Sequence, residues 1–97
     1  INLEDLPAHG RLWVFPANRD LTQEEANQCL NVVDEFLSSW SAHGVPLSAG
    51  RKLVEKRFLL IGVDIDIEVP SGCSIDALVK QLRTLGSDLG LSLIDHS

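Results

Sequence analysis

Two amphipathic helical patterns stand on either side of the most apolar run in this chain, and their order constrains the fold more than any other feature. In the first pattern, apolar residues recur every three or four positions from Ala26 to Trp40. Thr22 and Glu25 precede it as a capping box, in which each side chain accepts a hydrogen bond from the other residue's backbone N–H. The sequence therefore predicts a helix that begins after Thr22 and ends near Trp40 or Ser41.

The second helical pattern follows a loop rich in serine and glycine. Its apolar stripe begins at Ile75, and Gly90 is the residue expected to end the helix in the left-handed conformation. Either Ser71 or Ser74 can cap its start. Asp76 is expected in the first turn, where the helix dipole favours a negative charge.

Four further segments have the composition of strands, and they cover residues 12–15, 47–54, 58–65 and 91–94. The resulting order, β-α-β-β-α-β, is that of the ferredoxin-like fold. We therefore predict an α+β two-layer sandwich in which two helices cover one face of an antiparallel sheet. The 97 residues are enough for a single domain, residues 1–97, in which residues 1–10 form an N-terminal arm.

Charge and composition exclude several classes of partner. The net charge of −6 and the pI near 4.8 argue against nucleic-acid binding, because such binding needs a basic surface. The longest apolar run, residues 58–63, is far shorter than the roughly 20 residues of a transmembrane helix, and no secretory leader is visible. Two cysteines are too few for a disulfide framework or a cysteine-based metal cluster. We therefore expect a cytoplasmic protein with no membrane or nucleic-acid partner, no metal and no cofactor.

The loops that follow the first helix and precede the second helix are expected to meet. If consecutive elements alternate in direction, segments 41–45 and 70–74 lie at the same end of the molecule, which brings His43 close to Cys73. Further polar residues are expected to border this region, namely Arg11, Asp64, Asp66, Asp95 and His96.

This end supports a hypothesis of thiol chemistry. A cysteine at a helix N-terminus has its thiolate stabilised by the helix dipole and by free backbone N–H groups. His43 would then act as the base that activates Cys73, with Asp64 or Asp66 orienting the imidazole. Cys73 and His43 are accordingly the candidate catalytic residues. A metal site formed by His43, Asp64 and Cys73 matches no known ligand spacing and is not expected.

Two other readings of the same end remain open. In one, backbone N–H groups of residues 71–74 bind a small anion, with candidate ligand-binding residues Ser71, Gly72, Ser74, Asp64 and Arg11. In the other, all of these residues are structural. The serines then cap the helix, Cys73 is a small apolar plug, and His43 hydrogen-bonds a loop carbonyl.

The face of the sheet that no helix covers looks too apolar to remain in water. The core side of the third predicted strand is expected to hold Leu59, Ile61, Val63 and Ile65. Its other side still carries two large apolar residues, and the first strand is apolar on both sides. Such a patch is typical of an interface, and we expect a homodimer through Trp13, Phe15, Phe58 and Leu60. The alternative is that residues 1–7 fold back over this face.

Two motifs give the chain a family resemblance. The segment Trp40-Ser-Ala-His-Gly44 and the segment Ser71-Gly-Cys-Ser-Ile-Asp76 together resemble a group of small uncharacterised bacterial proteins, over roughly residues 6–96. Members are sometimes labelled ABC-transporter ATPases. That activity is not expected here, because the chain lacks a Gly-x-x-x-x-Gly-Lys-Ser/Thr loop. The resemblance implies a bacterial source and leaves the biochemistry open.

The function that the sequence favours is a non-catalytic domain, homodimeric, for interaction or for binding a small ligand. One alternative is a thiol-dependent enzyme or redox-responsive protein that uses Cys73 with His43. The other is an anion-binding site at the loop from Ser71 to Ser74.

Overall fold

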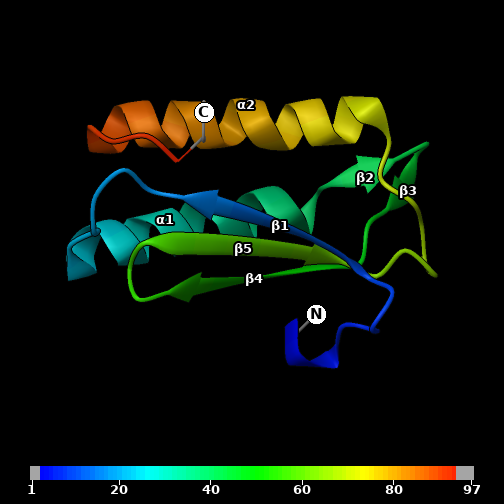
Figure 1. Cartoon of the computed structure of the whole chain (residues 1–97). Coiled ribbons are helices and arrows are strands. Elements are labelled where there is room, and N and C mark those ends of the chain that lie inside the picture. Colours follow the sequence, from blue (N-terminus) through cyan, green and yellow to red (C-terminus); the bar gives the residue numbers. More distant parts are fainter. Residues whose placement is uncertain (1–2, 94–97) are drawn as a thin grey trace.

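The computed structural model describes residues 3–93, which form a two-layer α+β sandwich (Figure 1). The elements in chain order are η1 (Leu3–Asp5), β1 (Arg11–Pro16), α1 (Gln23–Ser38), β2 (Ser41–Ala42), β3 (Val45–Pro46), β4 (Ala49–Val54), β5 (Phe58–Val63) and α2 (Gly72–Leu89). Strands β1, β5 and β4 form an antiparallel sheet in that order, and both helices lie on one of its faces. The predicted fold class is confirmed.

Both predicted helix starts are confirmed by their hydrogen bonds. Thr22 and Glu25 form the expected capping box of α1. Ser71 and Ser74 form a second capping box, which fixes Ser71 as the N-cap of α2. Because α2 therefore begins at Gly72, Asp76 lies in its second turn, and the prediction that it occupies the first turn is wrong.

Each helix also ends for a local reason. Helix α1 stops at Ser38, slightly before the predicted end, and the backbone N–H of Ser39 donates to the last turn. Helix α2 ends at Leu89, and its C-cap Gly90 has the predicted left-handed conformation with φ of 72°. Within α2, a Cβ at Gly86 would lie 2.7 Å from the carbonyl oxygen of Leu91. The glycine is therefore needed where the chain folds back on the helix.

The segment between α1 and β4 forms a small hairpin that the sequence analysis did not predict. Its strands β2 and β3 pair through Ser41 with Pro46 and Ala42 with Val45. The residues at the tip, His43 and Gly44, have φ of 55° and 75°. Two successive positive φ angles are typical of the tight turns that suit the twist of a hairpin.

The tight connection predicted between the next two strands is confirmed. Glu55 and Lys56 have φ of 54° and 55°, and the N–H of Arg57 donates to the carbonyl oxygen of Val54 at 3.0 Å. This turn sets the register in which Leu53 faces Leu59. Strand β4 begins at residue 49, two residues after the predicted start.

The predicted last strand is not formed over residues 91–93, and Ile94 lies outside the described residues. The N–H of Leu91 donates to the carbonyl oxygen of Gly86 at 2.9 Å and so completes the end of α2. The N–H of Ser92 donates to Asn18 Oδ1 at 2.9 Å. These bonds use backbone donors that a strand would have given to a ladder. Leu93 is nevertheless buried, as the prediction requires of an apolar residue there.

The core lies between the sheet and the helices. Leu59, Ile61 and Val63 are fully buried, which confirms the predicted core side of β5. Helix α2 contributes Leu78, Leu82 and Leu85 to the same cluster. Ile65 follows the strand in a turn and is half-buried. Among the described residues, no helix is long and apolar enough to cross a membrane.

Candidate functional site

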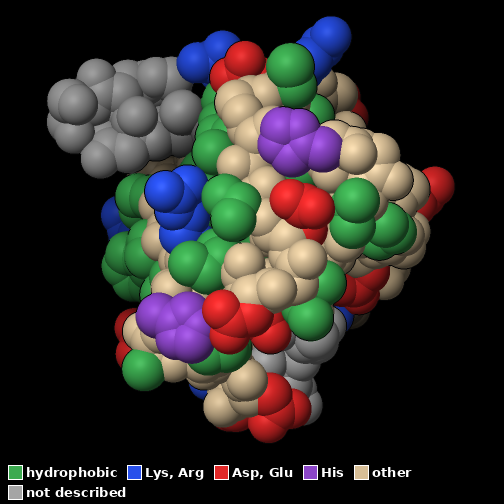
Figure 2. Space-filling view, turned by 90° about the vertical axis from the view of Figure 1, so that its right-hand side faces the viewer, with side chains coloured by type: hydrophobic (Ala, Val, Ile, Leu, Met, Phe, Trp, Pro, Cys, Tyr) green, Lys and Arg blue, Asp and Glu red, His purple; other side chains and the backbone are tan. Residues whose placement is uncertain are grey.

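His43 and Cys73 line the same pocket at one end of the molecule. The pocket has a volume of about 300 Å³ and lies between the end of α1, the β2–β3 hairpin and the start of α2. Ser71 and Ser74 also line it, so the predicted meeting of the two loops is present in the structure. Figure 2 looks onto this end and shows histidine and acidic side chains on its surface.

Trp40 holds the two sides of this pocket together. Its indole Nε1 donates a hydrogen bond of 2.8 Å to the backbone carbonyl of Ser74, and the side chain is buried. The ring also packs edge-on against Trp13 and lies 5.7 Å from the ring of Phe36. The hairpin that carries His43 is thereby anchored to the first turn of α2.

The side chains of His43 and Cys73 are both exposed to solvent. His43 lies at the exposed tip of the hairpin, and within the described residues its ring makes no hydrogen bond. The bond to a loop carbonyl considered in the sequence analysis is therefore not formed. Cys73 is exposed in the first turn of α2.

Cys29, in contrast, is enclosed in the core between α1 and the sheet. Burial raises the pKa of its thiol to about 11, because the thiolate would lose its hydration there. Both cysteines are free. Cys73 is therefore the thiol that reagents in solution can reach.

Two of the backbone N–H groups expected to bind an anion, those of Ser71 and Ser74, are already engaged in the helix cap. Ser71 Oγ accepts the N–H of Ser74 at 3.1 Å, and Ser74 Oγ accepts the N–H of Ser71 at 2.8 Å. Ser74 Oγ also donates to the carbonyl oxygen of Ser71. An anion at this helix end would therefore rely on the backbone N–H groups of Gly72 and Cys73.

In the described part of the chain, Asp64, Asp66 and Arg11 do not line the pocket. Asp64 Oδ1 accepts the N–H of Asp66 at 3.0 Å, and Asp66 Oδ2 lies 2.7 Å from His9 Nε2. Arg11 is exposed at the start of β1, opposite Val63. The predicted orientation of His43 by Asp64 or Asp66 therefore has no counterpart, and Asp95 and His96 lie outside the described residues. Within those residues, no group of three potential ligands could hold a metal ion.

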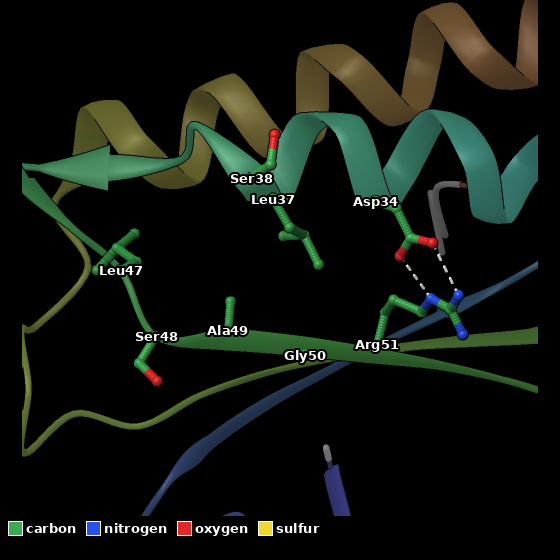
Figure 3. Close-up of a pocket in the computed structure, with 8 residues that line it drawn as sticks. All are labelled: Asp34, Leu37, Ser38, Leu47, Ser48, Ala49, Gly50 and Arg51. Carbon is green, nitrogen blue, oxygen red and sulfur yellow. Dashed lines mark hydrogen bonds and ion pairs between the residues drawn. The ribbon is translucent and has the colours of Figure 1, made fainter. Parts of the chain in front are cut away.

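A larger pocket, of about 540 Å³, lies between α1 and the edge strand β4 (Figure 3). Two hydrogen bonds cross it, from Arg51 Nε to Asp34 Oδ1 at 2.7 Å and from Arg51 Nη2 to Asp34 Oδ2 at 2.8 Å. These bonds lower the pKa of Asp34. The sequence analysis missed this pair, although the alternation of Arg51 with Leu53 places both on the helix side of the sheet. An inward-pointing charge on an edge strand opposes pairing with another sheet.

The uncovered face of the sheet carries a different set of residues from the predicted one. Trp13 lies opposite Ile61 and Phe15 opposite Leu59, so both point towards the helices. Their assignment to the open sheet face is therefore wrong. The uncovered face instead presents Leu12 and Val14, which are 52% and 53% exposed. The other two predicted residues, Phe58 and Leu60, do lie on this face. We call Leu12, Val14, Phe58 and Leu60 the open-face patch.

The N-terminal arm covers only one part of this face. Leu3 and Leu6 pack against Gly62, where a Cβ would lie 2.5 Å from Leu3 Cδ2 and 3.0 Å from Leu6 Cδ2. Glu4 Oε1 lies 3.6 Å from Lys52 Nζ. Figure 1 shows the arm on the side of the sheet opposite the helices. The alternative in which the N-terminal arm folds back over this face therefore describes part of it, and the dimer stays a prediction.

Comparison of this chain with family models, with curated proteins and with solved structures finds no significant match. The candidate functions therefore depend on the geometry of the sites themselves.

Proposed function

We propose that this chain is a non-catalytic interaction domain that forms a homodimer through the open-face patch. The observation that carries the proposal is the exposure of three large apolar side chains on one sheet face: Leu12 at 52%, Val14 at 53% and Phe58 at 37%. Contiguous exposed apolar surface of this kind is typical of an interface.

The charge distribution leaves the open-face patch nearly free of charge. The net charge of −6 opposes association of two copies, and a contact surface with few charges adds little close-range repulsion to that cost. Among the strand residues that face this side, Lys52 is the only charged one, and Glu4 pairs with it. The open-face patch is therefore a surface on which like-charged copies can meet.

The sheet geometry is also suitable for a two-fold contact. Val14 and Leu60 are paired across β1 and β5, near the middle of the sheet. Two sheets that pack face to face lie about 10 Å apart and interlock side chains from their inner faces. A two-fold axis close to this pair would place each open-face patch against its copy.

The experiment is light scattering and sedimentation of the wild-type chain and two charge variants. Val14→Glu puts a carboxylate in the centre of the patch and is expected to give a monomer. Ile67→Glu is the matched control, since Ile67 is 60% exposed in the loop after β5 and lies outside the patch. Thermal unfolding checks that both variants fold. A monomeric wild-type chain, or a Val14→Glu variant that still dimerises, contradicts the proposal.

A second candidate is a thiol-dependent reaction or redox response of Cys73, with His43 as its base. It is supported by the shared pocket of these two residues at the start of α2. The test is the pH dependence of Cys73 alkylation in the wild-type chain and in His43→Gln. A slower reaction in the variant supports the pair. A Cys73 that reacts in the folded chain as it does in urea contradicts it.

The cytoplasmic location, the bacterial source and the family resemblance stay predictions from the sequence. The anion-binding alternative is the weakest of the three functions, because the backbone N–H groups of Ser71 and Ser74 donate within the helix cap.

A further inference from the structure

We propose that the hollow between the N-terminal arm and the sheet binds a free α-amino acid with an apolar side chain. The hollow has a volume of about 250 Å³, and it is lined by four leucines and one pair of opposite charges: Leu3, Glu4, Leu6, Leu12, Lys52 and Leu60. The inference does not depend on the proposed homodimer, because it concerns a small molecule that binds to a single chain.

The sheet provides the floor of this hollow. Leu60 lies on the central strand β5 and pairs with Lys52 of the edge strand β4. Leu12 lies on β1, opposite Gly62 of β5. The floor is therefore apolar, with one cationic side chain on the strand at its edge.

The arm provides the wall of the hollow. Leu3 and Leu6 pack closely against the sheet, where a Cβ at Gly62 would lie 2.5 Å from Leu3 Cδ2. The arm also folds back on itself, since a Cβ at Gly10 would lie 2.6 Å from Leu6 Cγ. The N–H of Leu6 donates to the carbonyl oxygen of Leu3 at 3.1 Å, and the N–H of Gly10 donates to that of Pro7 at 2.8 Å. Two local turns and two glycines thus position the wall.

The two charged groups of the hollow are only loosely paired. Glu4 Oε1 lies 3.6 Å from Lys52 Nζ, which is beyond the usual hydrogen-bond distance of about 3 Å. In the part of the chain that the structure describes, neither side chain makes a hydrogen bond, and both are more than half exposed. The carboxylate of Glu4 and the ammonium group of Lys52 are therefore both available to a ligand.

This pair of charges selects the class of ligand. A carboxylate alone would complement Lys52 but would be repelled by Glu4, and an amine alone would be repelled by Lys52. A free α-amino acid carries both charges on one carbon atom. Its carboxylate can face Lys52 while its ammonium group faces Glu4, so that four charges alternate in sign. Its side chain can then lie on the leucines.

The size of the hollow favours a branched aliphatic side chain. A volume of about 250 Å³ equals that of roughly eight molecules of liquid water, close to the number of non-hydrogen atoms in leucine. A bound leucine would cover Leu12, which is 52% exposed, and would bury more of the half-buried Leu60. Because exposed charge pairs contribute little, we expect millimolar binding.

The first test titrates the intact chain with leucine and follows the methyl NMR signals of Leu3 and Leu6. These residues belong to the arm and not to the open-face patch, so they report binding whether or not the chain associates. Isocaproate is leucine without its ammonium group, isoamylamine is leucine without its carboxylate, and serine lacks the apolar side chain. Each is expected to bind at least about fivefold more weakly than leucine.

The outcomes of this titration are distinct. Equal affinity for leucine and for isocaproate or isoamylamine would show that the pair of charges does not recognise the ligand, and would overturn the inference. The absence of any shift with leucine close to its solubility limit would overturn it as well.

The second test measures leucine binding by four variants of the full chain. Glu4→Gln and Lys52→Gln each remove one charge, and each is expected to weaken binding about fivefold. Asp5→Asn and Lys80→Gln are the matched controls, because both residues are exposed and lie outside the hollow. They are expected to bind leucine as wild type does, and thermal unfolding checks that all four variants fold.

Two results of the second test contradict the proposal. Unchanged binding in Glu4→Gln and Lys52→Gln would show that leucine binds elsewhere. Equal losses in the controls would show a general effect of net charge instead of recognition in the hollow.

Discussion

The indole nitrogen of Trp40 donates a hydrogen bond of 2.8 Å to the backbone carbonyl of Ser74, a residue 34 positions later in the chain. This contact joins the end of α1 to the first turn of α2, and both of its residues line the pocket that His43 and Cys73 share. The bond therefore links the segment that leads to His43 with the helix turn that carries Cys73. The same ring also contacts Trp13 of the sheet, so the site is tied to both layers.

Trp40→Phe is expected to destabilise the fold by about 1–2 kcal/mol, because it keeps an aromatic ring in the core and removes the indole donor. The measurement is the free energy of unfolding in urea. Trp13→Phe is the control, since Trp13 is only half-buried and its indole makes no hydrogen bond in the described part of the chain. Equal losses in the two variants would show that the bond to Ser74 contributes nothing specific.

Thiol labelling of the native chain is expected to modify Cys73 and to spare Cys29. Cys73 is exposed, whereas Cys29 is enclosed and burial raises the pKa of its thiol to about 11. Mass spectrometry of the peptides after brief treatment with iodoacetamide at neutral pH measures the ratio. Labelling of both cysteines in urea is the control. Comparable labelling of Cys29 in the folded chain would contradict the described core.

Lowering the pH is expected to remove the stabilisation that the ionised carboxylate of Glu25 gives to the fold. Hydrogen bonds from Arg19 and from the backbone of Thr22 lower the pKa of Glu25 from 4.5 to about 2. The Glu25 carboxylate is harder to protonate in the folded chain than in the unfolded chain. Its contribution to the free energy of unfolding is therefore complete above about pH 4.5. It is lost as the pH falls through about 2.

Urea unfolding of wild type and Glu25→Gln across this range tests the claim. The difference in free energy of unfolding between wild type and Glu25→Gln is expected to shrink steadily below about pH 4.5. Glu24→Gln is the control, since it removes a neighbouring exposed carboxylate from the same helix turn. A difference between wild type and Glu25→Gln that stays constant down to about pH 2 would argue against the ion pair with Arg19.

Arg51→Leu is expected to leave the fold intact and to increase aggregation. Arg51 points inwards from the edge strand and pairs with Asp34, whose side chain is 51% exposed and stays hydrated when its partner is removed, so the loss of stability is expected to be small. Its charge opposes edge-to-edge pairing of sheets. Turbidity during heating measures the effect, and Arg83→Leu on α2 removes an equal charge as the control. Greater turbidity of Arg83→Leu would contradict the role of the edge.

The elements that could be predicted from sequence are those specified locally. The capping residues Thr22 and Ser71 and the end signal Gly90 each act within one turn of their helix. The alternation of Leu59, Ile61 and Val63 identified the core side of β5 because that side has no polar residue. The meeting of His43 with Cys73 followed from the alternating direction of the elements.

The side of the sheet on which Trp13 lies could not be predicted in this way. Strand β1 is apolar on both sides, so its own sequence does not say which side faces the helices. The orientation is set by pairing with β5 and by the contact of Trp13 with Trp40, and a slip of one residue would reverse it. The β2–β3 hairpin was missed for a related reason, because two-residue strands are too short to show any alternation.

The most direct test of the central claim is an isotope-filtered NMR experiment on a mixture of labelled and unlabelled chains, which detects only contacts between copies. The homodimer predicts intermolecular contacts among the methyl groups of Leu12, Val14 and Leu60 on the open face. Intermolecular contacts confined to Ile67 and Val69 in the loop after β5, or no intermolecular contacts at millimolar concentration, would contradict it.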